Sequence, residues 1–402
     1  MPMYDGYSLL TEKQAIVLDL GTKYTKFGFA GEASPRCIVR SEVKCPKTGQ
    51  VREVMNYTDK DDLYGLLVDF LHMLFFKHVQ LSPKERRLVV VESLLCPTIV
   101  RDTLAKVLFQ HFEVCSLLYV PSHLVCLATL AVDTGLVLDV GHQEALLVPV
   151  YEGVPVLRIW QAQPLAGAAI EQRLRNSLVE WYSNQDSLGD SIRKSQEASN
   201  LSESIIEDIK VRGSFVTKQE RGIVYWDGKE PSPPIPDLTY PIDGDRTISI
   251  PGPVREACHE VLFERDNDQM SLPNMILDAI LKSAVDMRRP LAENIVLVGG
   301  SVMVPGFKAR LLAELQLLLE SPQYKDQLNI NTFKFHNPPG KENYIAWLGG
   351  ALYGATDIIT MKSLTRESYS TLNSVPDWCS LLHNRLDHSG LIICVDTIHV
   401  YL

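Results

Sequence analysis

The sequence Ala15-Ile-Val-Leu-Asp19-Leu-Gly21 is a short apolar run that ends in Asp-x-Gly, and Gly135-Leu-Val-Leu-Asp139-Val-Gly141 repeats this pattern. Two strand-like stretches follow each copy. They are Tyr24 to Gly31 and Cys37 to Val43 after the first copy, and Ala145 to Val150 and Val154 to Trp160 after the second. The separation from residue 19 to residue 139 is typical of duplicated domains and not of a solenoid. The sequence therefore predicts two related α/β lobes.

Apolar residues at helical spacing predict further elements around these strands. Before the second copy, the expected elements are helices over Lys60 to His78 and Thr98 to Phe112 and a buried strand over Leu88 to Glu92. After it, we expect helices over Gly167 to Tyr182, Ala257 to Phe263, Pro273 to Ala284 and Phe307 to Leu319, and a strand over Ile295 to Val298. Ser183 to Ser204 is typical of a loop or a frayed helix, and the proline-rich Lys229 to Tyr240 of a surface loop. No fold is predicted after Pro376.

Composition excludes several classes of protein. A chain of 402 residues is too long for one hydrophobic core. The net charge of -10 disfavours nucleic acid and anionic membrane surfaces as partners. The best membrane candidate, Leu117 to Val132, contains Pro121 and is too short to span a bilayer, and Met1 to Lys13 does not resemble a secretory leader. The eight cysteines form no C-x-x-C pair, which predicts buried free thiols and a reducing compartment, the cytoplasm.

Three glycine-containing turns are candidates for a nucleotide site, because glycine lets backbone N–H groups approach phosphate closely. The first turn supplies Gly21, the Thr22 hydroxyl and the Lys26 ammonium. The second is Asp139-Val-Gly141, and the third is Gly299-Gly300 followed by Met303, which suits a loop next to an adenosine. Asp19 and Asp139 are suited to hold Mg²⁺ through water. Each feature alone is more often structural than functional: an Asp-x-Gly turn is usually a plain hairpin, and a strand lysine is usually solvated. Their combination in this order is far more specific.

The stretch from Ile16 to Gly31-Glu-x-x-Pro35-Arg36 resembles the opening of actin and its relatives. The other matching motifs are Val150-Tyr-Glu-Gly153, Pro164-Leu-Ala-Gly167, Ile206-Glu-Asp-Ile-Lys210, Val285-Asp-Met-Arg288, Ala292-Glu-Asn-Ile-Val-Leu-Val-Gly-Gly300, Met303-x-Pro305-Gly306 and Ala346-Trp347-Leu-Gly349-Gly350. The resemblance covers roughly residues 14 to 375. It implies the duplicated actin-like ATPase fold, with ATP or ADP and Mg²⁺ in a central cleft between two lobes. The implied first lobe is 1–134, the second is 135–345, and 346–402 returns to the first and ends in a divergent tail.

The resemblance also implies roles for individual residues. Gly21, Thr22 and Lys26 would contact phosphates, and Gly141 belongs to the second phosphate turn. Asp19 and Asp139 would lie around the hydrated metal. The residues expected around the sugar and base are Gly167, Lys210, Gly299, Gly300 and Met303.

Several departures from the actin pattern point away from catalysis. Actins orient the attacking water with a glutamine and a histidine, and we place Ala128 and Leu146 at the matching positions. Neither side chain can position a proton, so we expect an ATP binder and no enzyme, with no catalytic residue. The second phosphate turn carries His142 and Gln143 in place of an acidic residue and glycine. Two further replacements are Lys23 for a small residue and Val211 for the acid that would follow Lys210.

Another departure concerns assembly. Actins insert a small subdomain where this chain has only Arg40 to Thr58, too short for a folded subdomain, so 40–58 is where the first lobe is reduced. This short segment, the eroded catalytic site and Pro376-Asp-Trp-Cys-Ser-Leu381 together resemble the actin-related proteins of dynactin. That resemblance implies a subunit that ends the short actin-like filament of dynactin. The implied partners are the actin-related filament subunits and the pointed-end complex, in dynein-driven transport, without nucleic acid or membrane insertion. Two alternatives are an actin-related subunit of a nuclear chromatin-remodelling complex and an active ATPase or sugar kinase of the same superfamily.

Overall fold

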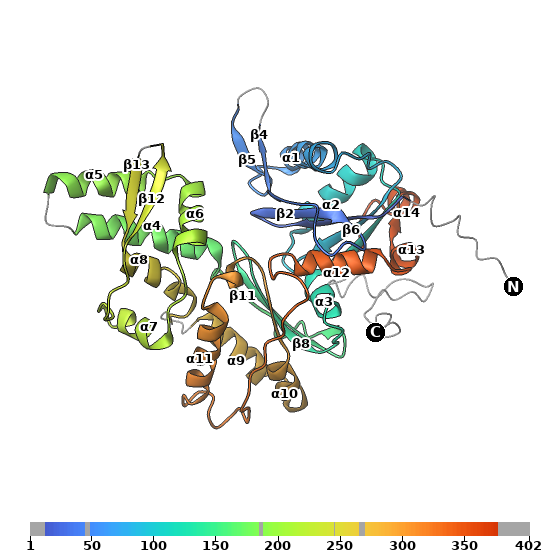
Figure 1. Ribbon diagram of the computed structural model, residues 1–402. Helices are drawn as coiled ribbons and strands as arrows, with labels where there is room; N and C mark the ends of the chain where they lie inside the picture. Colours follow the sequence, from blue (N-terminus) through green and yellow to red (C-terminus); the bar gives the residue numbers. More distant parts are fainter. Residues whose placement is uncertain (1–12, 45–48, 185–187, 245, 265–269, 377–402) are drawn as a thin grey trace. The chain divides into compact units, whose positions relative to one another are not determined.

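The computed structural model describes residues 13–44, 49–184, 188–244, 246–264 and 270–376 (Figure 1). The chain separates into two compact units, each of which is α/β. Unit 1 consists of Met1–Asp133, Glu152–Val154 and Asn337–Leu402, and unit 2 consists of Thr134–Tyr151 and Pro155–His336. The tail after Pro376, including the motif that ends at Leu381, lies outside the described residues, as does Cys45.

A mixed sheet with the strand order β15-β7-β6-β1-β2-β3 forms the centre of unit 1. Strands β1 (Ile16–Leu20), β6 (Arg87–Glu92) and β7 (Ser116–Pro121) are parallel neighbours. Strand β2 (Tyr24–Phe29) runs antiparallel to β1, and β3 (Cys37–Arg40) runs antiparallel to β2. The late strand β15 (Leu364–Thr365) adds to β7 in the antiparallel direction. The three strands predicted from the first copy of the repeat are confirmed, although β3 ends at Arg40.

Alternate residues of β1 face different helices, as a pleated strand requires. Ile16 and Leu18 are fully buried in a core that they share with α1 (Lys60–His72) and α2 (Thr98–Lys106). On the other face, α12 (Ile345–Gly354) packs against β1 and β6. The indole Nε1 of Trp347 donates to the Val17 carbonyl at 3.1 Å. The ring of Tyr369, in α14 (Arg366–Leu372), stacks on Phe109 with centroids 4.7 Å apart. Residues from both ends of the chain therefore build unit 1.

The two predicted helices of unit 1 are confirmed, and each ends in a wider turn. Helix α1 continues into the π-helix η2 (Met73–His78), and α2 continues into η3 (Val107–His111). The Asp59 side chain caps α1 by accepting hydrogen bonds from the Asp61 and Asp62 amides, both at 2.9 Å. The remaining helices of unit 1 are α3 (Ser122–Ala128) and α13 (Ile358–Lys362).

Residues 40–58 contain a two-stranded hairpin, which we call the 40–58 hairpin. Strand β4 (Glu42–Lys44) pairs antiparallel with β5 (Val51–Glu53), and residues 45–48 lie outside the described chain. Val54 is fully buried, and it belongs to the core shared with α1 and α2. Val43, Met55 and Tyr57 pack partly buried against the same core. The described part of the hairpin thus has no core of its own.

Unit 2 contains the second copy of the repeat, in a sheet with the strand order β10-β9-β8-β14. Strand β8 (Gly135–Val140) pairs antiparallel with β9 (Ala145–Tyr151) and parallel with β14 (Ile295–Val298). The predicted strand over Val154 to Trp160 is wrong. Only β10 (Val154–Pro155) and β11 (Gln161–Gln163) are extended, because residues 156–159 turn, with the Ile159 amide donating to the Val156 carbonyl at 3.1 Å.

The helices of unit 2 confirm some predictions and correct others. Helices α4 (Gly167–Ser183), α9 (Leu272–Lys282) and α11 (Phe307–Leu319) lie where predicted. The helix predicted over Ala257 to Phe263 is wrong. Helix α8 (Gly252–Ala257) begins earlier, with Pro253 in its first turn, and it ends where the predicted helix was to begin. Only the 3₁₀ turn η4 (Glu260–Leu262) lies within the predicted range after it. The expected loop or frayed helix over 183–204 contains α5 (Leu188–Ser199), and the predicted surface loop ends in β12 (Leu238–Asp243). Unit 2 also contains elements that were not predicted, among them α6 (Glu203–Gly213), α7 (Gln219–Trp226), β13 (Arg246–Ile250) and α10 (Val285–Glu293).

A buried ionic cluster ties α11 to the turn η4. The side chain of Arg310 is 1% exposed, and its Nη2 lies 2.8 Å from Glu260 Oε2. Its Nε lies 2.7 Å from Glu314 Oε1, one turn along the same helix. Burial raises the pKa of Glu260, and the Arg310 guanidinium opposes that shift. Removing one partner from such a cluster leaves a buried charge without compensation.

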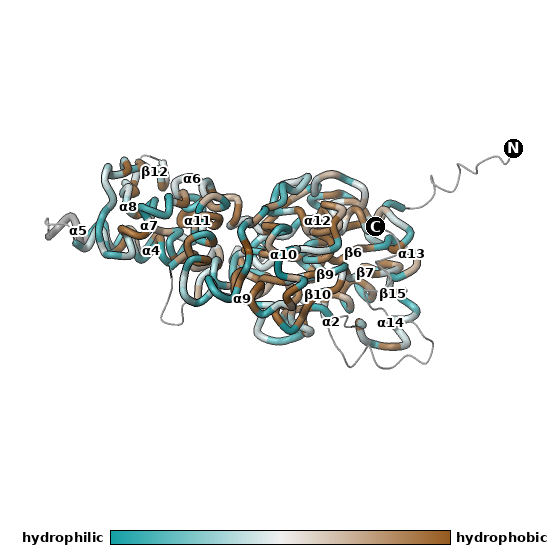
Figure 2. The backbone as a smooth tube through the Cα atoms, turned by 90° about the horizontal axis from the view of Figure 1, so that it is seen from below, coloured by the Kyte–Doolittle hydropathy of each residue, from teal (hydrophilic) through white to brown (hydrophobic). Residues whose placement is uncertain are grey.

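Figure 2 shows how hydrophobic and hydrophilic stretches alternate along the chain. The apolar stretch from Leu117 to Val132 forms β7 and α3. None of the helices in the described ranges is long and apolar enough to cross a bilayer.

The five described cysteines are free thiols: Cys37, Cys96, Cys115, Cys126 and Cys258.

Candidate functional site

The predicted site residues of unit 1 lie in the hairpin between β1 and β2. Asp19 and Lys26 are partners across the two strands, and the Lys26 ammonium lies 3.1 Å from Asp19 Oδ2. Gly21 begins the turn, where a Cβ atom would lie 2.5 Å from the Tyr24 carbonyl oxygen. The Ser41 hydroxyl donates to the Gly21 carbonyl at 2.6 Å. The turn that contains Thr22 is therefore fixed from both sides, and its first residue must be glycine.

Lys23, which departs from the actin pattern, is held by the 40–58 hairpin. Its ammonium lies 2.9 Å from Glu53 Oε1, and its side chain is only 11% exposed. The Ser41 amide donates to the Lys23 carbonyl at 3.0 Å, and the Val54 amide donates to the Ser41 carbonyl at 2.9 Å. The hairpin thus packs directly on the predicted phosphate turn of unit 1.

The structure corrects the position that we assigned to Ala128. The parallel strands β1, β6 and β7 bring Asp19, Glu92 and Pro121 to one edge of the sheet, the edge where ligands bind in α/β folds. The residues that follow this edge are Ser122 and His123, whereas Ala128 is the last residue of α3, almost two turns further on. The sequence did not show where the strand ends, because β7 and α3 form one apolar run.

His123 is the ionisable residue at the start of α3. It is 2% exposed, and burial lowers its pKa to about 3. The imidazole is therefore neutral at neutral pH. Sequence reasoning missed this residue because its surroundings are apolar.

The predicted site residues of unit 2 lie where three predicted motifs meet. The Gly141 amide donates to the Glu144 carbonyl at 3.1 Å and closes the turn after β8. The Gly141 carbonyl accepts from the Ser301 hydroxyl at 2.7 Å and from the Gly167 amide at 3.2 Å. A Cβ atom on Gly167 would lie 3.3 Å from that same hydroxyl. The turn after β8, the start of α4 and the loop after β14 are thus in contact.

The two consecutive glycines after β14 differ in what they require. Gly299 has φ of +98°, and a Cβ atom there would lie 2.3 Å from the Val140 carbonyl oxygen and 2.8 Å from Asp139 Oδ1. A Cβ atom on Gly300 would meet nothing within 4 Å among the described residues. Met303 is 41% exposed in the loop that follows. The fold therefore requires glycine at position 299, whereas the described residues leave room for a side chain at position 300.

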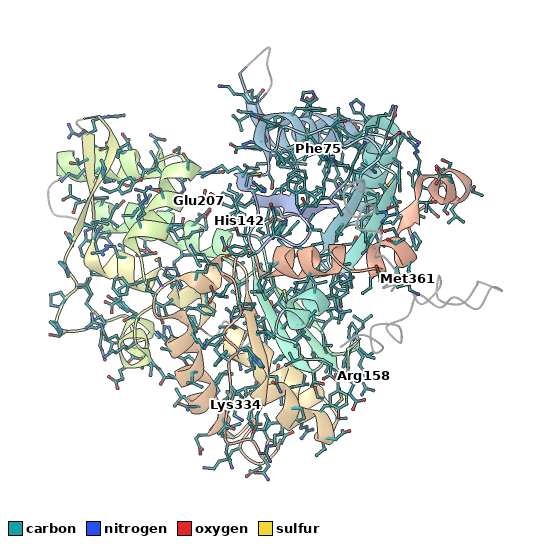
Figure 3. The ribbon with its side chains drawn as sticks, turned by 45° about the vertical axis from the view of Figure 1, so that its right-hand side comes forward. Phe75, His142, Arg158, Glu207, Lys334 and Met361 are labelled. Carbon is teal, nitrogen blue, oxygen red and sulfur yellow. The ribbon has the colours of Figure 1, made fainter. Side chains whose placement is uncertain are left out.

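Lys210 lies in α6 and forms an ion pair that sequence reasoning missed. Its ammonium is 2.5 Å from Glu171 Oε1, in the second turn of α4. The His142 ring, labelled in Figure 3, has its Nδ1 atom 3.9 Å from the same oxygen. Glu171 follows Gly167 at helical spacing of four residues, which is the only sequence signal that places it here. Val211, next to Lys210, is 68% exposed and supplies no acid.

Leu146 lies in β9 directly opposite Asp139 and is 4% exposed. Its alkyl side chain cannot accept or orient a proton. Within the described ranges, no group of three or more His, Cys, Asp or Glu residues is placed to hold a metal ion. Magnesium typically keeps several waters and is held by one or two carboxylates together with substrate phosphates.

Comparison with known proteins gives one family. The Actin family model matches residues 10–374. "Actin-related protein 10" of Dictyostelium discoideum is 26% identical over 92% of this chain and 90% of its own length. "Putative actin-29" of the same organism is 25% identical over 90% of this chain and 95% of its own length. "Actin-like protein 7A" of Mus musculus is 26% identical over 84% of this chain and 76% of its own length.

Proposed function

The chain belongs to the actin family, and on that premise we propose that it is a non-polymerising subunit that caps the pointed end of dynactin's short actin-like filament. The 40–58 hairpin is the observation that carries this proposal. Where actins have a small subdomain, the described residues form two three-residue strands whose apolar neighbours belong to the core of unit 1. The likeness to an actin-related protein over most of both chains supports the proposal.

Filament growth needs two complementary surfaces on every subunit, because head-to-tail contacts are heterologous. In actins the small subdomain supplies the surface at the pointed end. A chain with only the 40–58 hairpin lacks that surface, while the rest of the actin-like body is retained. Such a subunit joins a filament through one end and stops its growth at the other. The free end then anchors the pointed-end complex of dynactin, in the cytoplasm, and so supports dynein-driven transport.

We also propose that the chain binds ATP or ADP with Mg²⁺ and does not turn the nucleotide over. Gly21, Thr22 and Lys26 would hold phosphates from unit 1, and the glycines of unit 2 would hold phosphate, sugar and base. The open space at Gly300 supports this assignment, since a Cβ atom there would meet nothing within 4 Å among the described residues. With Leu146 in place of a proton acceptor, water activation loses a contribution of typically about 10²–10⁴-fold in rate. The nucleotide is then a structural ligand.

A mixing experiment tests the capping proposal. The full-length protein is purified, and its mass is measured by analytical ultracentrifugation over a wide concentration range. It is then mixed with short filaments of actin-related subunits and located by electron microscopy with a gold label. A subunit with the intact small subdomain is the matched control, and it should incorporate along the filament.

We expect a monomer at all concentrations and label at one filament end only. Self-assembled filaments, or label along the whole length, would refute capping. Mass spectrometry of stoichiometric partners separates the two assemblies at issue. Recovery of chromatin-remodelling subunits in place of dynactin subunits would assign the protein to a nuclear chromatin-remodelling complex.

A further inference from the structure

The loop that joins α7 to β12 carries an exposed proline-rich sequence (Figure 1). We call residues 229–237 the proline loop, and its central sequence is Pro231-Ser-Pro-Pro-Ile-Pro236. The loop forms neither helix nor strand. Its first proline is buried, whereas Pro233, Pro234 and Pro236 are exposed. Three of the four prolines are therefore accessible from solvent.

Two arginine side chains hold the backbone of the proline loop. Arg221 Nη1 donates to the Pro233 carbonyl at 3.1 Å. Arg255 Nη1 donates to the Pro236 carbonyl at 2.7 Å. Arg221 is itself fixed, because its Nη2 atom donates at 2.8 Å to Glu256, whose side chain is only 1% exposed. The backbone of the loop is thus tied to a buried carboxylate.

A third contact brings the loop against the first residue of α8. A Cβ atom on Gly252 would lie 1.8 Å from the Ile235 carbonyl oxygen, so only glycine fits there. The Gly252 amide also donates to Asp237 Oδ1 at 2.9 Å. Among the described residues, by contrast, the Pro234 carbonyl accepts no hydrogen bond. The loop is therefore held on both sides of an exposed proline that the protein itself leaves unused.

The spacing of the anchored carbonyls suits one class of conformation. The carbonyls of Pro233 and Pro236 are three residues apart, and a polyproline II helix has three residues per turn. Groups three residues apart in such a helix lie on the same side. Anchors at this spacing hold one side of the segment and leave Pro234 on another.

The chemistry of the sequence indicates how a partner would recognise it. Proline has no N–H group, and four of the six residues from 231 to 236 are prolines. The segment is therefore a poor addition to the edge of a sheet, which needs regular N–H donors. Aromatic-lined grooves bind proline-rich segments instead, because these segments are already ordered before binding. Pro233-Pro-Ile-Pro236 has the P-x-x-P spacing that such grooves accept.

Charged residues around the loop indicate what surrounds the groove of the partner. Asp227, Glu230 and Asp237 are exposed acids. Lys229 is the basic residue among them, and its ammonium lies 4.0 Å from Asp227. The excess of negative charge favours a groove whose rim carries lysine or arginine, since complementary charge steers association and excludes other partners.

We propose that the proline loop is a docking site for a protein domain with an aromatic-lined groove and a basic rim, and that the groove receives Pro233, Pro234 and Pro236. The anchored backbone lowers the entropy that docking costs. This inference is independent of filament capping and of nucleotide binding, because the loop shares no residue with the 40–58 hairpin or with the predicted nucleotide site.

A purely structural role is the competing explanation, in which the prolines only stiffen a surface loop. Stiffening lowers the conformational entropy of the unfolded chain and so changes the melting temperature. It creates no affinity for another domain. Binding and thermal stability therefore separate the two explanations.

The experiment measures binding of the full-length protein to purified WW, SH3 and EVH1 domains by biolayer interferometry. The variants are Pro234→Ala and, as a matched control at an exposed proline elsewhere in unit 2, Pro322→Ala. We expect at least one domain to bind wild type and Pro322→Ala equally. Pro234→Ala should bind it at least about tenfold more weakly, the usual effect of truncating a central interface residue. Replacing the groove tryptophan of that domain by alanine should also abolish binding.

Each result decides the proposal. Failure of all three kinds of domain to bind wild type overturns it, and so does equal binding of wild type and Pro234→Ala. Circular dichroism shows whether each variant is folded. Should Pro234→Ala not fold, Glu230→Lys, which reverses a charge beside the prolines and leaves them in place, must weaken binding to the basic-rimmed domain. Unchanged binding by Glu230→Lys would then overturn the proposal.

Discussion

Substitution of the two neighbouring glycines after β14 separates a fold requirement from a ligand requirement. In Gly299→Ala, the new methyl group would lie 2.3 Å from the Val140 carbonyl oxygen, and the residue would keep φ of +98°. In Gly300→Ala, the backbone has φ of -70° and the methyl group meets nothing within 4 Å among the described residues. The two variants therefore add the same atom in very different surroundings.

The expected cost of Gly299→Ala follows from two effects. An alanine held in a sparsely populated backbone region costs about 1–3 kcal/mol. Overpacking against the carbonyl oxygen costs about 1–3 kcal/mol more. Because about 1 kcal/mol shifts Tm by roughly 2–4 °C in a unit of this size, the variant should melt at least about 5 °C below wild type. Gly300→Ala should melt at the wild-type temperature or slightly above it, since alanine restricts the unfolded chain.

The assay is thermal unfolding of the nucleotide-stripped full-length protein, followed by circular dichroism, with ATP titrated afterwards. If the space at Gly300 receives part of a nucleotide, Gly300→Ala weakens ATP binding while the stability of the stripped protein is unchanged. Equal melting temperatures for the two variants would refute the reasoning about Gly299. An unchanged affinity in Gly300→Ala would remove Gly300 from the site.

Three further predictions concern turnover and stability. Nucleotide extracted from the purified protein should be mainly ATP. Because Leu146 cannot position water, phosphate release should be at least about 10²-fold slower than in filamentous actin. Turnover at the rate of actin would contradict this prediction. Burial lowers the pKa of His259 to about 3, below the ordinary value of about 6.5, so between these values the unfolded chain binds a proton that the folded chain does not. The free energy of unfolding should therefore decrease as the pH is lowered below about 6.5. His259 contributes about 2 kcal/mol of this decrease at pH 5, and His259→Gln should remove that contribution while the buried His123 keeps its own. Arg310→Met should cost about 3–5 kcal/mol because it leaves two buried carboxylates, whereas the exposed Arg289→Met should scarcely change the urea midpoint.

Much of the framework could be predicted from the sequence, because strong periodicity coincides with clear boundaries. Helix α11 has the predicted bounds, Phe307–Leu319, since Gly306, with φ of +92°, marks its start. Strand β8 likewise ends where the Asp-x-Gly turn begins. The strand predicted from Val154 to Trp160 was wrong because the alternation of apolar residues does not reveal that the chain turns at residues 156–159. No boundary between β7 and α3 was predicted, because an apolar run can be strand or helix.

For the candidate site too, some residues could be predicted from the sequence and others could not. The glycines could be named from the sequence, because each turn carries a local signal. The partners of charged groups could not, since Glu171 and Lys210 are far apart in the chain and meet only when α4 and α6 pack. The ion pair between Lys23 and Glu53 depends similarly on how the 40–58 hairpin folds back on the first turn. Long-range pairing of side chains is the information that local patterns lack.

The order in which the ribosome makes the chain matters for a unit built from both ends. Strands β1, β2, β6 and β7 are synthesised first, but α12 and Tyr369, which pack on them, come only after all of unit 2. At about 5–20 residues per second, the nascent sheet waits roughly 10–40 s with one apolar face uncovered. During that interval it is a substrate for chaperones and prone to aggregation. A premature stop codon just after residue 336 would therefore leave unit 2 whole and unit 1 permanently unfinished.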